Sequence, residues 1–314
     1  MKILPGVVLV VVVALLVFAI AGLAATWAPD RSVESLKARW APPPSQFVSV
    51  AGMQVHLRDE GPRDDPMPIV LLHGTSASLH TWDGWAQSLV QTRRVIRFDM
   101  PAFGLTGPNP QNDYSIKSYV AFVTAVMDTL GVQRFVLGGN SLGGQIAWET
   151  AVALPGRVQK LILVDAGGYA FVSESIPLGF QIARLPVLRN LMAYTLPRGI
   201  IQNSLENVYG NAALVTPTLI DRYYDLTLRV GNRKALGYRL EQGYASNEAT
   251  IKSLKLPTLI LWGAKDRLIP PENGRKFARD IAGSQLVMFD ALGHVPHEED
   301  APATLAEVVK FLQK

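Results

Sequence analysis

The sequence predicts an α/β protein built on a mostly parallel, doubly wound sheet. Short apolar runs, typical of buried parallel strands, alternate with longer segments of helical pattern from residue 68 to the end of the chain. The alternation lapses once, over residues 168–253, which are helical and rich in apolar side chains. Residues able to do chemistry follow several of the apolar runs directly, at the position where open α/β sheets place their sites.

Eight strands are expected in chain order. Residues 47–50 and 53–59 alternate in polarity like an antiparallel hairpin at a sheet edge. The apolar runs that predict parallel strands are 68–72, 94–98, 134–138, 160–164, 257–262 and 285–289. Helical patterns between or after them include 115–130, 142–152, 271–281 and 304–312.

Composition and charge exclude several functional classes. The chain has 314 residues, 48% of them hydrophobic, which is enough to bury one large core. It has no cysteine, so disulfides, thiol catalysis and cysteine metal sites are excluded. The net charge of +4 comes without a basic stripe interleaved with aromatics, which argues against nucleic-acid binding. We find no dinucleotide or phosphate-loop motif and expect neither a cofactor nor a metal.

The first 28 residues differ from the rest of the chain. No charged side chain occurs from residue 3 to residue 28, and residues 7–25 are almost wholly apolar, long enough to cross a bilayer as a helix. We therefore expect residues 1–28 to be a membrane anchor, with the catalytic domain outside the cytoplasmic membrane of a bacterium. The alternative is a cleaved secretory signal, because Ala19-Ile20-Ala21 offers a small-residue cleavage pattern.

We interpret residues 29–45 as a linker beside the membrane. Residues 31–41 predict a short amphipathic helix on the membrane surface, with Trp27 and Trp40 at the interface and the basic residues at the lipid phosphates. Three prolines, 42–44, then predict a stiff spacer.

The most informative motif is Gly139-Asn140-Ser141-Leu142-Gly143, which directly follows the strand predicted over 134–138. A strand that runs through Gly-x-Ser-x-Gly into a helix is the setting of a nucleophile elbow. Bulk two residues before or after the serine would clash with the neighbouring backbone, so glycine suits both positions. The helix that follows points its positive N-terminal end at the serine. Ser141 is therefore the predicted nucleophile.

An acid and a base follow later strands. Asp266 lies just past the strand predicted over 257–262, and His294 lies past the strand over 285–289. Both are thus expected at the carboxyl edge of the sheet, with His294 as general base and Asp266 orienting its ring. Asp165, which follows the strand over 160–164, is the competing candidate for the acid.

The fourth part of the site is an oxyanion hole. The strand over 68–72 opens into His73-Gly74-Thr75, where a turn would fold the loop back beside the serine. The backbone N–H groups of Thr75 and Leu142 are then expected to point at the developing oxyanion.

Taken in chain order, the four motifs are the turn at His73, the elbow at Ser141, and the positions of Asp266 and His294. They resemble those of the α/β-hydrolase fold, the superfamily of esterases, lipases and carbon–carbon hydrolases, and the resemblance covers about residues 46–314. Residues 98–106 also resemble the family loop Asp-x-Pro-Gly-x-Gly-x-Ser, with departures at Ala102 and Thr106. The order Ser, Asp, His is the family's order. The resemblance implies a core of residues 46–167 and 254–314, with residues 168–253 as a helical cap over the site.

The apolar content of the predicted cap suggests a pocket for an acyl group. The candidate lining residues are Leu178, Phe180, Met192, Tyr194 and Tyr223.

The sequence therefore predicts a serine carboxylic-ester hydrolase acting on a small-molecule or lipid ester through Ser141, His294 and Asp266. The alternative enzyme is a meta-cleavage-type carbon–carbon bond hydrolase, because the segment 139–144 resembles the elbow of that group. Against it, the loop 74–78 lacks the glycine-rich oxyanion sequence that such enzymes show. The alternative of another class is a non-catalytic hydrolase-fold protein that binds a ligand or partner. The sequence leaves the oligomeric state open.

The remaining histidines and acids are given structural roles. His297 is expected at the surface or behind the site, and His73 is expected to shape the oxyanion loop. Asp99 and Glu298 are interpreted as structural. His56 and His80 carry no signal of function.

Overall fold

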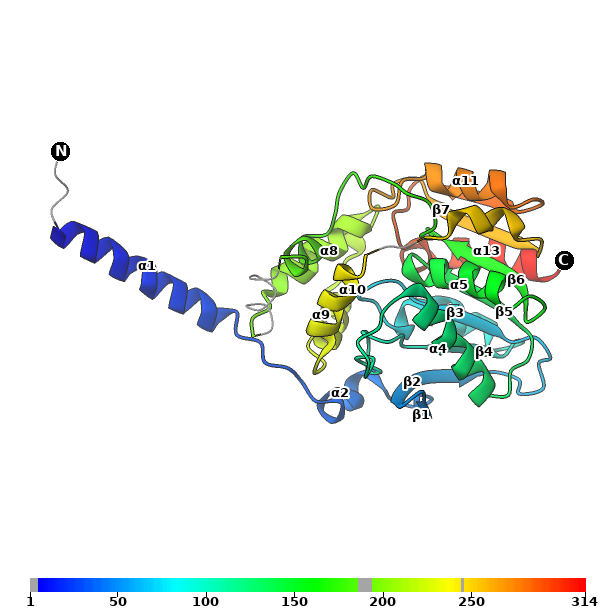
Figure 1. Cartoon of the computed structure of the whole chain (residues 1–314), viewed down its shortest axis with the longest axis horizontal. Coiled ribbons are helices and arrows are strands. Elements are labelled where there is room, and N and C mark those ends of the chain that lie inside the picture. Colours follow the sequence, from blue (N-terminus) through cyan, green and yellow to red (C-terminus); the bar gives the residue numbers. More distant parts are fainter. Residues whose placement is uncertain (1–4, 186–193, 244–245) are drawn as a thin grey trace.

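The computed structural model describes residues 5–185, 194–243 and 246–314. Within them, eight strands form one sheet in the order β1-β2-β4-β3-β5-β6-β7-β8 (Figure 1). The strands are β1 (Gln46–Val50), β2 (Met53–Glu60), β3 (Ile69–Leu72), β4 (Val95–Phe98), β5 (Phe135–Asn140), β6 (Val158–Val164), β7 (Thr258–Gly263) and β8 (Gln285–Phe289). Each of them matches a predicted strand to within two residues at either end.

The sheet is mostly parallel, as predicted. β1 pairs with β2 and β2 pairs with β4 in antiparallel fashion, whereas the pairs from β4 through β8 are parallel. The β1–β2 turn consists of Ala51 and Gly52, both at positive φ (49° and 77°). Two positive φ values in a two-residue loop match the right-handed twist of the strands, which explains why this hairpin forms at the edge.

Helices cover both faces of the sheet, because alternate strand residues point to opposite sides. Val70 and Leu72 of β3 belong to one apolar cluster, and Ile69 and Leu71 belong to another. The first cluster includes residues of α4 (Ile116–Thr129), α5 (Leu142–Ala153) and α11 (Glu272–Asp280), and the second includes residues of α3 (Asp83–Leu89) and α13 (Ala301–Leu312). The predicted doubly wound α/β architecture is therefore confirmed.

Side-chain caps fix where two of the predicted helices begin. The Ser115 hydroxyl accepts a hydrogen bond from the N–H of Ser118 at the start of α4. The Asp300 carboxylate accepts one from the N–H of Ala303, so α13 begins at Ala301, three residues before the predicted start. Two short helices flank the site: η1 (Leu79–Trp82) and α12 (Pro296–Glu299).

Helices replace the strand–helix alternation between β6 and β7, and we refer to residues 168–253 as the insertion. Their order is α6 (Leu178–Ala183), α8 (Arg198–Val208), η2 (Ala212–Leu214), α9 (Pro217–Thr227), α10 (Asn232–Glu241) and η3 (Glu248–Ser253). Figure 1 shows α8, α9 and α10 gathered between the sheet and the N-terminal helix α1 (Pro5–Ala25).

The prediction of a membrane anchor over residues 1–28 is wrong on the described part of the chain. Helix α1 extends away from the sheet (Figure 1). A bilayer requires about 20 consecutive apolar residues. In the described residues, no helix combines the length and the apolarity needed to cross a membrane. The prediction that residues 1–28 anchor the protein in a membrane is therefore corrected.

The linker 29–45 also differs from its prediction. Its helix, α2 (Val33–Trp40), packs against α9 of the insertion, and Trp40 is buried there. The Trp40 indole N–H donates to Asp225 at 2.9 Å, and the Arg31 guanidinium donates to the same carboxylate at 2.6 Å. Trp40 therefore faces protein, because a buried carboxylate satisfies its indole N–H.

Candidate active site

Ser141 stands at a sharp turn between β5 and α5. Its backbone has φ 55° and ψ −117°, in the positive-φ region that non-glycine residues rarely adopt. Backbone segments approach closely here. A Cβ on Gly139 would lie 2.2 Å from the carbonyl oxygen of Gly143, and a Cβ on Gly143 would lie 2.3 Å from that of Leu72. Glycine is therefore required at both positions, and the strained turn presents Ser141 at the start of a helix.

Asp266 and His294 meet past the ends of β7 and β8. His294 Nδ1 lies 2.7 Å from Asp266 Oδ2, and both residues are buried. The other Asp266 oxygen accepts hydrogen bonds from the N–H groups of Leu268 and Ile269. These contacts fix the carboxylate against the ring. With Nδ1–H assigned as the donor, Nε2 is the ring nitrogen that can take up a proton.

Ser141 and His294 line one cavity of about 810 Å³, together with Gly74, Thr75 and Leu142. The Gly74 loop packs directly on the turn, since a Cβ on Gly74 would lie 3.1 Å from Ser141 Cβ. The Thr75 hydroxyl oxygen is buried without a hydrogen-bond partner among the described residues. The predicted nucleophile, base and oxyanion donors thus surround the same space, and Asp266 contacts His294 from outside it.

Two buried residues shape the loops on which this arrangement depends. The Met100 N–H donates to His73 Nε2 at 2.9 Å, so His73 Nδ1–H donates to the carbonyl of Gly74 at 2.8 Å. Burial lowers the pKa of His73, which keeps this tautomer neutral. The Asp99 carboxylate accepts from His56 Nδ1, from the N–H of Leu79 at the start of η1 and from the N–H of Leu105. Burial opposes its charge, but His56 beside it holds the pKa of Asp99 below its usual range.

His297 does not face the surface. Its ring is 1% exposed, stacks on Trp82 with ring centroids 4.1 Å apart, and places Nε2 2.9 Å from the Thr81 hydroxyl. Burial lowers the pKa of His297 well below its usual value, so it is neutral. It packs behind the site, which was the second of the two positions expected for it.

Asp165, the competing acid, lies beside the Asp266–His294 pair. One carboxylate oxygen each of Asp165 and Asp266 and one ring nitrogen of His294 all lie within 4.8 Å of one another. Asp165 Oδ1 accepts a hydrogen bond from the backbone N–H of Gly263 at 3.0 Å. The structure pairs His294 with Asp266 rather than with Asp165.

The insertion holds the loop that carries His294. The His294 N–H donates to the carbonyl of Val208 at the end of α8, at 2.8 Å. The Glu299 carboxylate accepts from the N–H groups of Gly293 and Gly210, both at 2.7 Å, and so bridges the two segments. A Cβ on Gly210 would lie 2.6 Å from the carbonyl oxygen of Ala291. We call this contact between residues 208–211 and 291–294 the seam.

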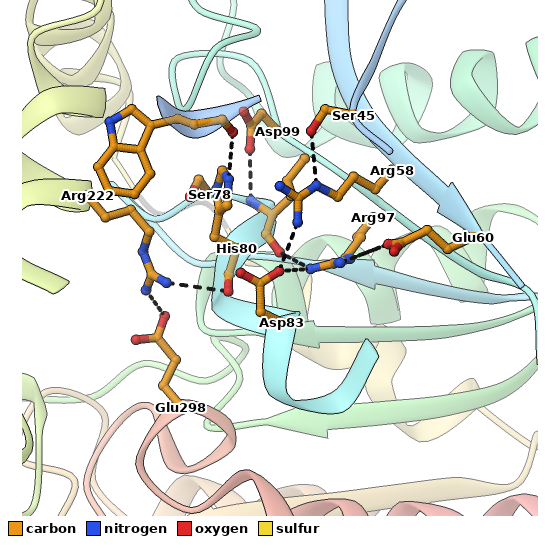
Figure 2. A network of polar contacts seen from close by, with 12 residues as sticks. Ser45, Arg58, Glu60, Ser78, His80, Asp83, Arg97, Asp99, Arg222 and Glu298 are labelled. Carbon is orange, nitrogen blue, oxygen red and sulfur yellow. Dashed lines mark hydrogen bonds and ion pairs between the residues drawn. The ribbon is translucent and has the colours of Figure 1, made fainter. Parts of the chain in front are cut away.

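A second carboxylate ties the insertion to the core beside the seam. Glu298 accepts hydrogen bonds from Arg222 at 2.7 Å, from Tyr209 at 2.5 Å and from Tyr223 at 3.2 Å. Figure 2 shows the Arg222 guanidinium between Glu298 and His80, whose carbonyl it also contacts at 3.5 Å. Glu298 is therefore structural, as expected: it joins α12 to α9, and Arg222 extends the connection to η1.

Sequence reasoning missed the residues that position the others. Asn140 Nδ2 donates to the carbonyl of His294 at 3.0 Å, which joins the turn at Ser141 to the histidine loop. Asn140 stands inside the elbow motif, but nothing in the sequence relates it to residue 294. Val208 contributes its backbone carbonyl and Glu299 its side-chain carboxylate, and no motif marks either contact.

The insertion supplies most of the apolar lining of the cavity. Phe180 and Tyr223 line it as predicted, whereas Leu178 and Tyr194 are not among the lining residues. Met192 lies outside the described residues. The further apolar side chains that line the cavity from the insertion include Phe171, Val172, Ile176, Ile200, Leu205 and Leu236.

Comparison with known proteins gives one family. The family model for the alpha/beta hydrolase fold matches residues 67–301. A 2-hydroxy-6-oxo-2,4-heptadienoate hydrolase from Pseudomonas putida is 30% identical over 79% of this chain and 89% of its own length. A 2-hydroxymuconate semialdehyde hydrolase from a Pseudomonas species is 28% identical over 84% of this chain and 92% of its own length.

Two solved structures extend the comparison. A meta-cleavage product hydrolase from Pseudomonas fluorescens superposes with a TM-score of 0.73 at 26% identity, covering 86% of this chain and 97% of its own. A membrane phospholipase A, described as a bacterial virulence factor, superposes with a TM-score of 0.74 at 25% identity. That match covers 98% of this chain and 96% of the phospholipase.

Proposed function

The chain belongs to the α/β-hydrolase family, and on that premise we propose that it is a serine hydrolase of carboxylic esters. Ser141 is the nucleophile, His294 the general base and Asp266 the acid that orients the base. The observation that carries the proposal is the 2.7 Å contact between His294 Nδ1 and Asp266 beside a strained Ser141, with serine and histidine lining one largely apolar cavity. In this proposal residues 46–167 and 254–314 are the catalytic core and residues 168–253 are its cap.

The reaction follows from the roles of these residues. His294 Nε2 takes the proton of the Ser141 hydroxyl as its oxygen attacks the ester carbonyl. The N–H groups of Thr75 and Leu142 donate to the resulting oxyanion, each contributing about 3 kcal/mol by precedent. The imidazolium then returns the proton to the departing alcohol. Water, deprotonated by His294, cleaves the acyl-enzyme in the same way and releases the acid.

An apolar acyl group fits the lining of the cavity. Apolar side chains of the insertion form much of the lining of the cavity, and burying each methylene there contributes about 0.8 kcal/mol. The similarity to a membrane phospholipase A, which covers nearly the whole of both chains, supports an ester of a lipid. We therefore place medium to long acyl esters ahead of short, polar ones.

A second candidate function is hydrolysis of a carbon–carbon bond in a dienoate. The names of the relatives at 30% and 28% identity favour it, and such a substrate carries a carboxylate that needs a cation. Two arginines are among the described lining residues, Arg184 and Arg233. Arg233 already pairs with Asp30 at 2.5 Å, and Arg184 is exposed. The described residues that line the cavity therefore offer an apolar wall for an acyl chain more clearly than they offer a buried cation for the carboxylate of a dienoate.

One set of assays separates these functions. The full chain is tested on p-nitrophenyl esters of increasing acyl length and on a dienoate substrate, with Ser141→Ala alongside. We expect ester hydrolysis that depends on Ser141 and rises with acyl length, together with labelling of Ser141 by a fluorophosphonate. Turnover of the dienoate with inert esters would replace the proposal by the second candidate. Failure to label Ser141, with no turnover of either class, would leave a non-catalytic binding protein.

A further inference from the structure

Two carboxyl groups share one buried space at the carboxyl edge of the sheet. Asp165 follows β6 and Asp266 follows β7, and they are 0% and 2% exposed. Both contribute to the cluster in which ligand atoms lie within 4.8 Å of one another and of His294. Asp165 is also held at a positive φ of 43°, a conformation that costs free energy for a residue other than glycine. The reaction proposed above uses only one of the two carboxyls.

The hydrogen-bond donors around the two carboxyls are unequally divided. Asp266 faces three N–H groups, those of Leu268, Ile269 and the His294 ring. Asp165 Oδ1 faces the N–H of Gly263, whereas Asp165 Oδ2 is buried with no partner that donates to it among the described residues. An anionic oxygen without a donor is costly in such a place, whereas a protonated oxygen can itself donate.

We propose that Asp165 is a second acid of this site, with a proton on Oδ2 that it donates in a hydrogen bond to the Asp266 carboxylate, and that it replaces Asp266 as the charged partner of His294 when Asp266 is neutralised. The proposal rests on the function proposed above. In the natural chain Asp165 acts through Asp266 and is a positioning residue.

The surroundings of Asp165 agree with a neutral carboxyl. Burial raises the pKa of Asp165 well above its usual value, and the Asp266 charge raises it further. The other titratable groups around this cluster are His294, which follows β8, and Glu299 of α12, whose charge acts in the same direction on Asp165 as that of Asp266. Replacing Asp266 by asparagine removes the nearer negative charge. Asp165 then releases its proton to solvent, and the pair keeps one negative charge beside the imidazolium.

The experiment measures how fast a fluorophosphonate labels Ser141 between pH 5 and 9, a readout that needs no knowledge of the natural substrate. Four full-length proteins carry the comparison, namely the natural chain, Asp165→Asn, Asp266→Asn and the double variant, and Asp290→Asn and Ser141→Ala serve as controls. Where a serine hydrolase has a single acid, its asparagine variant loses about 10⁴-fold. With a second acid, we expect Asp266→Asn to lose only about 10²-fold and the double variant about 10⁴-fold.

The single variant Asp165→Asn is expected to lose about threefold, because the asparagine amide can still donate to Asp266 while its oxygen accepts from Gly263. The pattern is strongly non-additive, as expected for residues that substitute for one another. Asp290→Asn, at an exposed acid just past β8, is the matched control and should label like the natural chain.

Two results would overturn the proposal, and a third would overturn the function on which it rests. A loss of about 10⁴-fold in Asp266→Asn alone would overturn it, even if the double variant failed to fold. Equal rates for Asp266→Asn and the double variant, at melting temperatures that show both are folded, would also overturn it. If Ser141→Ala labels as fast as the natural chain, the function proposed above fails instead, which keeps the two failures distinguishable.

Discussion

Two regions of the molecule are held in place by different kinds of contact. One is the edge of the sheet that carries Ser141, Asp266 and His294, and the other is the insertion. Parallel strand pairing aligns the ends of β5, β7 and β8, and close backbone approaches at glycines fix the turn at Ser141. The insertion instead depends on side chains far apart in sequence, such as Arg31 and Trp40 on Asp225. The proposed reacting groups thus rest mainly on backbone geometry, whereas the insertion is held by apolar clusters and by polar contacts between side chains far apart in sequence.

The seam is where these two systems meet. The carbonyl of Val208, at the end of α8, accepts the N–H of His294, and Glu299 joins Gly210 to Gly293. His294, the proposed general base, is therefore positioned partly by the insertion, which also lines the cavity. Changes at the catalytic edge, at the seam and in the insertion should consequently have effects of different size and kind.

The largest effect is expected at the catalytic edge. Ser141→Ala should lower ester hydrolysis by about 10⁶-fold, because no other group can form the acyl-enzyme. Ser204→Ala, which removes a serine that lines the same cavity from α8, should change it by less than about tenfold. Steady-state kinetics on one ester measures both. Similar losses in the two variants would contradict the assignment of the nucleophile.

The seam should give the next largest effect. Gly210→Ala would place a Cβ 2.6 Å from the carbonyl oxygen of Ala291, so the histidine loop must move. A displacement of that kind is expected to cost about 10²-fold in kcat. Gly199→Ala in α8, where a Cβ meets nothing within 4 Å, is the control and should be silent. Normal kcat in Gly210→Ala would show that the seam does not position His294.

Within the insertion, the effect should fall on stability rather than on chemistry. Asp225→Asn removes a buried carboxylate from Arg31, Arg39 and Trp40 and should lower the free energy of unfolding by about 2 kcal/mol, since the two arginines are half exposed. Urea unfolding measures the change. The exposed pair Glu34–Lys37 offers the comparison: Glu34→Gln should cost less than about 0.5 kcal/mol.

The smallest effect concerns pH. His80 joins the core to the linker through its ring contact with the Trp40 carbonyl, and burial lowers the pKa of His80 to about 3. The unfolded chain binds a proton at this histidine below about pH 6.5 and the folded chain does not, so stability falls as pH falls through that range. Between pH 6 and pH 5 the loss from His80 is about 1 kcal/mol. His80→Gln should reduce the pH dependence of urea unfolding by that amount, and an unchanged slope would contradict a neutral, buried His80.

The strands were predicted well because their signal is local. Each parallel strand contains a short apolar run, and each predicted run is a strand in the structure, although β4 and β6 include polar residues and β8 is only half-buried. The fate of His297 shows where such reasoning stops. Its burial depends on Trp82 and Thr81, more than two hundred residues earlier in the chain, and no pattern around residue 297 indicates them. Residues 1–28 show the same limit. Their apolar composition predicted a membrane anchor, but among the described residues no helix is long and apolar enough to cross a membrane.

The sequence by itself determined the α/β class, the turn at Ser141 and the position of three acids and bases past strand ends, because strand patterns and glycine requirements are local properties of the chain. Only the tertiary structure decided which carboxyl pairs with His294. Asp165 and Asp266 follow adjacent strands and have the same sequence signal, but the loop after β7 turns Asp266 toward the imidazole and surrounds it with N–H donors. That choice depends on side-chain directions at the ends of three strands, which come together only when the sheet is complete.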